Sequence, residues 1–178
     1  MNSHVQTQLA VPVTRRDHIR GPFNAPVTLL EYGDFECPYC GQAHAIVQAV
    51  EQEMGDQLRF AFRHFPLTNM HPHAEHAAEA AESAGAQGMF WEMHDLLYEN
   101  QDALDDRDIA NYAAELGIDV RRIVSDIVSG AHSGKIRQDF VSGVRSDVNG
   151  TPTFFINGMR YDGPRDVYSM LQALQEEL

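Results

Sequence analysis

The sequence predicts an α/β fold in which an all-helical insertion separates a β-α-β half from a β-hairpin-α half. Three observations lead to this prediction. Strand, helix and strand patterns follow one another over residues 27–67. Residues 72–148 carry only helical patterns, and strand character returns at "TPTFFINGMRYDG" ahead of a final amphipathic segment. We therefore expect an N-terminal arm over residues 1–20, a core built from residues 21–71 and 149–178, and an insertion over residues 72–148.

The first half is predicted as a strand, a helix and a second strand. Residues 27–32 of "VTLLEYGDF" form a short apolar run that is typical of a buried strand. Helical spacing then predicts a helix from about Pro38 to Met54, with an apolar face formed by Ala43, Ile46, Val47 and Val50. In "LRFAFRHFPL", large apolar side chains alternate with smaller or charged ones, which predicts a second strand. A strand-helix-strand unit of this kind makes a parallel pair.

The insertion contains several predicted helices. "HAEHAAEAAESAGAQ" is rich in alanine and glutamate, and Gly117 provides a helix stop after "DDRDIANYAAEL". Asp119 can cap the next helix, whose apolar stripe would be Ile123, Ile127 and Val128. "SGKIRQDFVSGVRSDV" predicts a further helix. Residues 1–20, ahead of the core, are mixed and polar, and we expect them to form a poorly ordered arm.

The last part of the chain combines a hairpin with a helix. Two β-rich runs flank Asn157-Gly158, the strongest short-range signal for a β-hairpin. The segment "PRDVYSMLQALQEEL" follows and predicts a helix with one apolar face, formed by Val167, Leu171, Leu174 and Leu178.

Composition restricts the partners. The 178 residues contain 26 acidic against 13 basic side chains, and the formal net charge of -13 makes nucleic acid and anionic membranes unfavourable partners. No basic segment followed by an apolar run opens the chain, so no signal peptide is visible. No apolar stretch approaches the roughly 20 residues that a bilayer requires. The sequence therefore predicts a cytoplasmic protein, and a periplasmic location is the less favoured alternative.

Cys37 and Cys40 are the only cysteines in the chain, and they have the separation of a C-x-x-C motif. A structural disulfide is the less favoured use of the pair, because the cytoplasm keeps most thiols reduced and because a disulfide that closes so short a loop would constrain the unfolded chain little. Pro38 suits the first position of a helix, so Cys37 would lie at the helix N-terminus, where N–H groups and the helix dipole favour a thiolate. Cys40 falls one turn later, within reach of a mixed disulfide on Cys37. The spacing thus predicts a redox-active pair.

A metal site is the alternative use of the two cysteines. Structural zinc sites require four ligands, and the chain has two thiols. His71, His73 and His76 cluster in "HPHAEH", but no second C-x-x-C motif accompanies them. We expect these histidines to begin a helix as exposed or packed residues, and we expect no metal. His44, one turn after Cys40, is expected to pack or to face solvent, and a role in tuning the thiols is its alternative.

Pro152 in "GTPT" stands at the start of the strand pattern "TFFI". One interpretation is simple, since proline is tolerated where a strand begins. The other gives the Thr151–Pro152 peptide bond the cis form and places the backbone of Thr151 beside Cys37, where an extended peptide can pair with it.

Three strings carry a family resemblance: "EYGDFECPYC", the insertion with "HPHAEHAAEAA" and "GMFWEMHDLLYENQ", and "VNGTPTFFINGMRYDGP". The chain resembles the DsbA-like family of thioredoxin-fold thiol-disulfide oxidoreductases over residues 17–178. The resemblance implies a thioredoxin core, with Cys37 as the attacking thiol, Cys40 as the resolving thiol and Pro152 in a cis-proline loop. It also implies that Glu31 is a buried acid that accepts the proton of Cys40. From the residues alone, Glu31 would be a surface acid at a strand edge.

Two features differ from the best-known periplasmic oxidases of that family. The dipeptide between the cysteines is Pro38-Tyr39, which is the pair that glutaredoxins use, whereas those oxidases carry Pro-His. The visible chain also lacks a signal peptide. Because the dipeptide helps to set the redox poise, the oxidising strength does not follow from the resemblance. We expect the substrate to contact Pro38, Tyr39, Thr151 and Pro152.

The leading interpretation is a dithiol-disulfide oxidoreductase without a cofactor. It would act on protein or low-molecular-weight thiols and disulfides, with a redox partner protein or glutathione. A glutathione-dependent, glutaredoxin-like enzyme is the second hypothesis. A non-catalytic module that binds a peptide or a metal is the third.

The insertion also needs a surface on which to bury its apolar side chains. We expect it to pack over the end of the sheet near Cys37 and to wall a substrate groove. Burial within the insertion's own core is the alternative use of these residues, which are Phe90, Trp91, Met93, Leu96 and Leu97.

Overall fold

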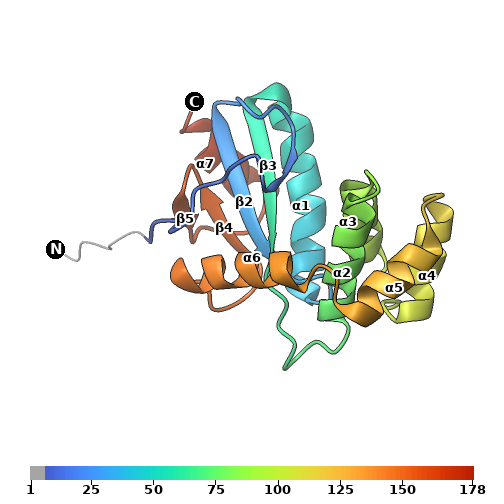
Figure 1. The fold of residues 1–178 in the computed structure, drawn as a ribbon. Helices are drawn as coiled ribbons and strands as arrows, with labels where there is room; N and C mark the ends of the chain where they lie inside the picture. Colours follow the sequence, from blue (N-terminus) through green and yellow to red (C-terminus); the bar gives the residue numbers. More distant parts are fainter. Residues whose placement is uncertain (1–6) are drawn as a thin grey trace.

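The computed structural model describes residues 7–178 and shows a five-stranded sheet with helices on both faces (Figure 1). The strand order is β1-β3-β2-β4-β5, with β2 and β3 parallel and the other neighbours antiparallel. The elements are β1 (His18–Arg20), β2 (Val27–Gly33), α1 (Pro38–Met54), β3 (Leu58–His64), α2 (Ala74–Gly85), α3 (Phe90–Glu99), α4 (Asp106–Glu115), α5 (Val120–Ser129), α6 (Ser133–Arg145), β4 (Thr153–Ile156), β5 (Met159–Tyr161) and α7 (Val167–Gln175), with a short 3₁₀ turn at Gly55–Gln57.

The β-α-β unit and the hairpin are confirmed. The helix from Pro38 to Met54 has the predicted bounds, and β2 runs one residue further than expected, to Gly33. Asn157 and Gly158 both have positive φ, at 47° and 82°, as the tight turns of hairpins require. Asn157 also fixes the turn to the sheet, because its side-chain Oδ1 accepts a hydrogen bond from the Thr28 N–H at 2.9 Å.

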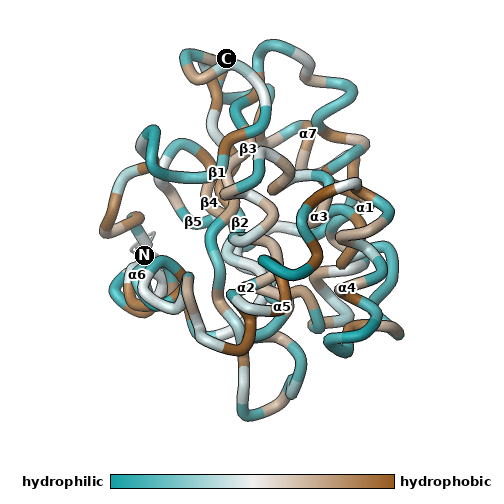
Figure 2. The backbone as a smooth tube through the Cα atoms, turned by 45° about the vertical axis from the view of Figure 1, so that its right-hand side comes forward, coloured by the Kyte–Doolittle hydropathy of each residue, from teal (hydrophilic) through white to brown (hydrophobic). Residues whose placement is uncertain are grey.

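The two faces of the sheet hold two apolar clusters. Val27 and Leu29 of β2 pack with α1 and α7, whereas Leu30 and Tyr32 pack on the opposite face. Figure 2 shows this layering, with α6 on one side of the strands and α1 and α7 on the other. The alternation along β2 puts Glu31 on the α1 face, and the chemistry of the site depends on that placement.

Helix α6 packs on one face of the sheet and is separate from the layer formed by helices α2 to α5. Phe140 of α6 stacks on Phe65, with ring centroids 4.3 Å apart. Gly143 permits this close packing, because a Cβ there would lie 2.8 Å from the Phe65 ring. The helical segment expected over residues 72–148 therefore divides into a layer made of α2 to α5 and a helix that covers the sheet.

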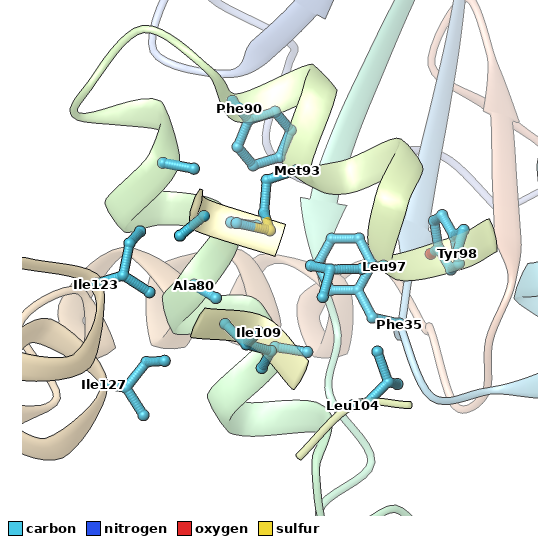
Figure 3. Close-up of a cluster of buried hydrophobic side chains, with 14 of the residues drawn as sticks. Phe35, Ala80, Phe90, Met93, Leu97, Tyr98, Leu104, Ile109, Ile123 and Ile127 are labelled. Carbon is cyan, nitrogen blue, oxygen red and sulfur yellow. The ribbon is translucent and has the colours of Figure 1, made fainter. Parts of the chain in front are cut away.

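The layer of α2 to α5 shares its core with the cysteines. Side chains from all four helices point toward one another in Figure 3, and Phe35, Phe62 and both cysteines belong to the same cluster. Phe90, Met93 and Leu97 are buried, as expected, and Trp91 is half-buried against the same cluster. These residues therefore fill the insertion's own core and also pack it against the site.

Asp119 caps α5 as predicted, but Val128 was wrongly assigned to the apolar stripe: it is 78% exposed, because it lies about 100° around the helix from Ile127.

The N-terminal arm corrects another expectation. Residues 1–6 lie outside the described part of the chain, but residues 7–20 are packed rather than poorly ordered. Arg63, 3% exposed, donates to both carboxylate oxygens of Asp17, to the carbonyls of Val11 and Pro12, and to the Tyr32 hydroxyl. These five bonds use all five guanidinium N–H donors. The sequence pattern does not show that a strand arginine, Arg63, holds the arm.

The last helix is shorter than the sequence suggested. It ends at Gln175, and Met170 and Leu174 are its buried residues. Leu178 lies beyond its end and is 56% exposed, so its expected place on the apolar face is wrong.

We expect Asp17→Asn to lower the free energy of unfolding by about 3 kcal/mol, because it leaves the buried Arg63 charge without its counterion. Asp162→Asn is the matched control: Asp162 also pairs with an arginine, Arg160, but is 71% exposed, and its change should stay within about 0.5 kcal/mol. Urea unfolding measures both values. Equal, small effects would show that the arm does not depend on the Arg63 pair.

Candidate active site

The turn between β2 and α1 positions the first cysteine. Cys37 is the N-cap of α1, in an extended conformation, and Pro38 opens the helix as predicted. The Cys37 N–H donates to the Asp34 carbonyl at 3.1 Å, and the Cys37 carbonyl accepts from Gly41 N–H at 3.1 Å. The Cys37 side chain therefore lies at the helix end where N–H groups lack partners and the dipole is positive.

The sheet register brings the second segment of the site to the same place. Tyr32, near the end of β2, pairs with Thr153 at the start of antiparallel β4. The residues that precede Thr153 therefore meet the turn that follows β2. The Thr151–Pro152 peptide bond is cis, as expected, and the Cys37 sulfur lies 3.4 Å from the Thr151 carbonyl oxygen.

The two thiols have opposite electrostatics. A hydrogen bond from Cys40 is the main cause that lowers the pKa of Cys37, to about 5, with further help from the Thr151 side chain and the N–H groups of Cys40 and Tyr39. Burial raises the pKa of Cys40 well above its ordinary value, and the bond to Cys37 raises it further. Cys40 is fully buried, and Cys37 retains 4% exposure. Neither sulfur is in a disulfide. Cys37 is therefore the thiolate and Cys40 the thiol at neutral pH.

Glu31 lies on the α1 face of the sheet, 1% exposed. It pairs with Phe62 of β3 on one side and Phe154 of β4 on the other, so its strand is central and the surface position suggested by the residues alone is wrong. Burial raises the pKa of Glu31 to about 8, against the nearby Tyr98 hydroxyl, which lowers it. The negative charge of Glu31 in turn raises the pKa of Cys40. The burial implied by the resemblance is thus confirmed.

The expected substrate contacts differ in exposure. Pro38 and Tyr39 face solvent, and Tyr39 is 63% exposed. Thr151 is half-buried, and Pro152 is buried. Tyr39 is one of the large apolar side chains on the surface, and Met70, in the loop before α2, is another at 72% exposure.

Gln101, just after α3, is a site residue that the sequence analysis missed. Its Nε2 donates to the carbonyls of Phe35 and Cys37 at 2.9 and 2.8 Å. Gly41 leaves room for it, because a Cβ there would displace the amide end of the Gln101 side chain. The helical layer therefore holds the cysteine turn directly. Gln101 is the last residue of "GMFWEMHDLLYENQ", one of the strings that carry the family resemblance, and nothing else in the sequence indicated its role. A contact between residues 64 positions apart leaves no periodic pattern in the sequence.

Two acids of the turn were also missed. The buried Asp34 carboxylate accepts from the N–H groups of Glu36 and Leu67 and from His71 Nδ1, each at 2.8 Å. Glu36 accepts from both the backbone N–H and Nδ1 of His73. These bonds tie residues 65–73 to the cysteine turn. His71 and His73 therefore serve two different carboxylates, and the third histidine of that cluster, His76, pairs with Asp106.

Comparisons with known proteins agree with this geometry. Residues 14–176 match the family model described as Thioredoxin. The chain belongs to the thioredoxin family. Its fold matches BdbD of Bacillus subtilis in the oxidised state, with a TM-score of 0.84 at 21% identity, covering 99% of this chain and 98% of that one. It also matches alpha-DsbA1 of Wolbachia pipientis, with a TM-score of 0.79 at 18% identity, covering 94% and 93% of the two chains. The fold is thus that of DsbA-like members of the thioredoxin family.

The curated relatives with the higher sequence identity are named as antiporters. The chain is 48% identical over 167 residues to a Na(+)/H(+) antiporter NhaA 3 of Salinispora tropica, and 43% identical over 164 residues to an NhaA 1 of Mycolicibacterium vanbaalenii. The match covers 93% and 90% of this chain but 26% of each relative. The chain thus spans about a quarter of their length. In the described residues, no helix is long and apolar enough to cross a membrane.

We expect iodoacetamide to modify Cys37 before Cys40 in the reduced protein, with a rate that reaches half its maximum near the Cys37 pKa of about 5. The reason is that only the thiolate reacts. Mass spectrometry of quenched samples locates the label, and Cys37→Ser is the control that leaves Cys40 alone. First labelling of Cys40, or a midpoint near the unperturbed ~8.5, would contradict this assignment.

Proposed function

We propose that the protein is a dithiol-disulfide oxidoreductase of the DsbA-like type, acting on protein or low-molecular-weight thiols through Cys37 and Cys40. The observation that carries the proposal is the asymmetry of the pair. One sulfur has a low pKa at a helix N-terminus, and the other is a fully buried thiol one turn away with a carboxyl group on the adjoining strand. A structural pair has no need of that difference.

The reaction is a reversible exchange of two electrons. The Cys37 thiolate attacks one sulfur of a substrate disulfide, forming a mixed disulfide and releasing the other substrate sulfur as a thiolate. Cys40 then loses its proton and attacks the Cys37 sulfur, and the second substrate thiolate leaves. The substrate ends reduced, and the protein ends with a Cys37–Cys40 disulfide. The reverse sequence oxidises a dithiol substrate.

Glu31 is the proposed acceptor of the Cys40 proton. It is the buried carboxyl group that raises the Cys40 pKa by its charge, and its own pKa of about 8 is close to the working range of a general base. A water-exposed base would not reach a fully buried thiol. In the reverse direction, the protonated Glu31 returns the proton to the departing Cys40.

The substrate is proposed to bind across the Thr151 backbone. The Thr151 carbonyl already faces the Cys37 sulfur at 3.4 Å, so an extended segment paired with this backbone presents its sulfur to Cys37. The exposed Pro38 and Tyr39 flank that position and can cover the segment from the helix side.

The antiporter names concern much longer proteins, of which this chain matches about a quarter. The cytoplasmic location stays a prediction.

The glutaredoxin-like alternative also remains, because Pro-Tyr separates the cysteines. Equilibration of the reduced and oxidised protein with glutathione tests the direction: a potential near ~-120 mV favours oxidation of substrates, and one near ~-270 mV favours reduction.

We expect Cys40→Ser to accumulate a mixed disulfide through Cys37, because the attacking thiolate remains and the resolving thiol is gone. Cys37→Ser should lose insulin-reducing and thiol-oxidising activity altogether. Mass spectrometry after incubation with a disulfide-bonded peptide, and separately with oxidised glutathione, identifies the adduct. Adducts with glutathione alone would favour the glutaredoxin-like enzyme. No adduct with either would favour a non-catalytic module.

We expect Glu31→Gln to slow the resolution of a peptide mixed disulfide by about a hundredfold at pH 8, by loss of the general base. In the parent protein the rate should fall as pH drops through the Glu31 pKa of about 8, because the carboxylate becomes protonated. The variant should lose that inflection. Glu53→Gln, an exposed acid on α1, is the control and should keep it. An unchanged inflection in Glu31→Gln would assign the proton transfer to another group.

A further inference from the structure

A second polar cluster lies between α1 and α3, outside the thiol pair. His44 extends from α1 one turn after Cys40 and is 6% exposed, and His94 and Asp95 come from α3. One ligand atom of each of these three residues lies within 4.8 Å of the other two. Glu99 stands one turn further along α3 and places a carboxylate oxygen 3.9 Å from His44 Nε2. One further histidine and two carboxylates thus lie close to His44 at the interface of the two helices.

His44 Nε2 is the unusual atom of this cluster. It is buried and has no hydrogen-bond partner among the residues that the structure describes. Asp95 Oδ1 and Glu99 Oε1 both lie 3.9 Å from it, too far for hydrogen bonds. Buried polar atoms nearly always have a partner, and here a ring nitrogen without one lies 3.9 Å from each of two carboxylate oxygens.

The charge of the cluster suits a cation. Asp95, Glu99 and Glu51 bring three negative charges. Arg20 donates hydrogen bonds to both Glu51 and Asp95, and its single positive charge compensates one of the three. With neutral imidazoles, two negative charges remain. A divalent ion would balance them.

We propose that His44, His94, Asp95 and Glu99 bind a divalent transition-metal ion of the zinc class. Imidazole nitrogen and carboxylate oxygen are the donors that such ions take in proteins. In a tetrahedral zinc site the ligand atoms lie about 3.3 Å apart, so the two 3.9 Å separations must close by about 0.6 Å. The Glu99 side chain is 53% exposed and can make that movement by rotating.

A second group of potential ligands does not share these features. His18 Nε2 and His64 Nε2 lie 2.6 and 2.8 Å from the same oxygen of Glu82. At those lengths both facing ring nitrogens are hydrogen-bonded to the carboxylate. In the His44 cluster His94 Nδ1 bonds Asp95 Oδ1 in the same way, at 2.8 Å, but His44 Nε2 stays 3.9 Å from two carboxylate oxygens and has no hydrogen bond within the described part of the chain. The proposal therefore concerns the His44 cluster alone.

An ion at this point would link the cysteine helix to the helical layer. His44 is the α1 ligand, and the other three come from α3, whose continuation carries Gln101 to the Cys37 carbonyl. Binding should therefore stabilise the interface that holds the cysteine turn. Because the ion would bind the folded chain and not the unfolded one, it should raise the melting temperature.

The test uses full-length protein in which the thiols cannot bind metal, prepared as Cys37→Ser/Cys40→Ser and, independently, as the oxidised parent protein. Cobalt(II) is titrated in as a spectroscopic substitute for zinc. We expect one ion per chain, visible absorption bands typical of tetrahedral nitrogen and oxygen ligation, and displacement by zinc. Absence of stoichiometric binding in both preparations would overturn the proposal.

Variants locate the ion. His44→Gln and Glu99→Gln should each weaken cobalt binding at least about tenfold, and zinc should raise the melting temperature of the parent protein but not of Glu99→Gln. Glu99 is exposed, so its variant should keep the fold, which circular dichroism checks. Glu92→Gln on the exposed side of α3, and His18→Gln in the other group, should bind as the parent does. Unchanged binding in both His44→Gln and Glu99→Gln, or loss in His18→Gln instead, would refute the assignment.

Discussion

The interaction of the Cys40 thiol with the Cys37 sulfur, across the first turn of α1, lowers the pKa of Cys37, and the rest of the site depends on it. It exists only if Cys37 ends the turn and Cys40 stays in the helix, so the start of α1 must be fixed. Asp34 does this from the strand side by holding its own turn, and Gln101 does it from the helical layer by binding the Cys37 carbonyl. Without these contacts the two sulfurs would still be neighbours in sequence, but Cys37 would lose the interaction with Cys40 that lowers its pKa.

The helical layer explains why the two thiols differ so strongly. Its core continues into Phe35, Phe62 and the cysteines, so the side of α1 that carries Cys40 is packed against apolar groups and is closed to water. Burial disfavours the charged form of any group there, and both Cys40 and Glu31 respond with a raised pKa. Cys37 escapes because helix N–H groups and the Cys40 thiol compensate its charge. One packing arrangement thus produces one reactive and one protected sulfur.

The sequence predicted what is local. The first strand, α1 and the Asn157-Gly158 hairpin follow from apolar spacing and turn residues, and the helix-terminal cysteine follows from Pro38. What joins distant segments did not follow. Gln101 contacts a turn 64 residues away, Arg63 holds an arm that looks like a polar tail, and α6 covers the sheet because Gly143 admits Phe65. Glu31 was predictable only in part. Its strand follows from the local sequence, but its central position requires the pairing of β2 with both β3 and β4. Only the family resemblance indicated that Glu31 is buried.

The low pKa of Cys37 also bears on the direction of exchange. At pH 7 an ordinary thiol is protonated, whereas a Cys37 pKa of about 5 stabilises the reduced protein by about a hundredfold through its thiolate. A tenfold change corresponds to about 30 mV for two electrons, so the thiolate makes the disulfide at most about 60 mV more oxidising. The buried Glu31 acts in the opposite sense, because its charge repels a thiolate beside it and it must hold a proton for the reduced pair to be stable. Cys37 therefore shifts the pair toward oxidising its substrates, and Glu31 limits how far that shift goes.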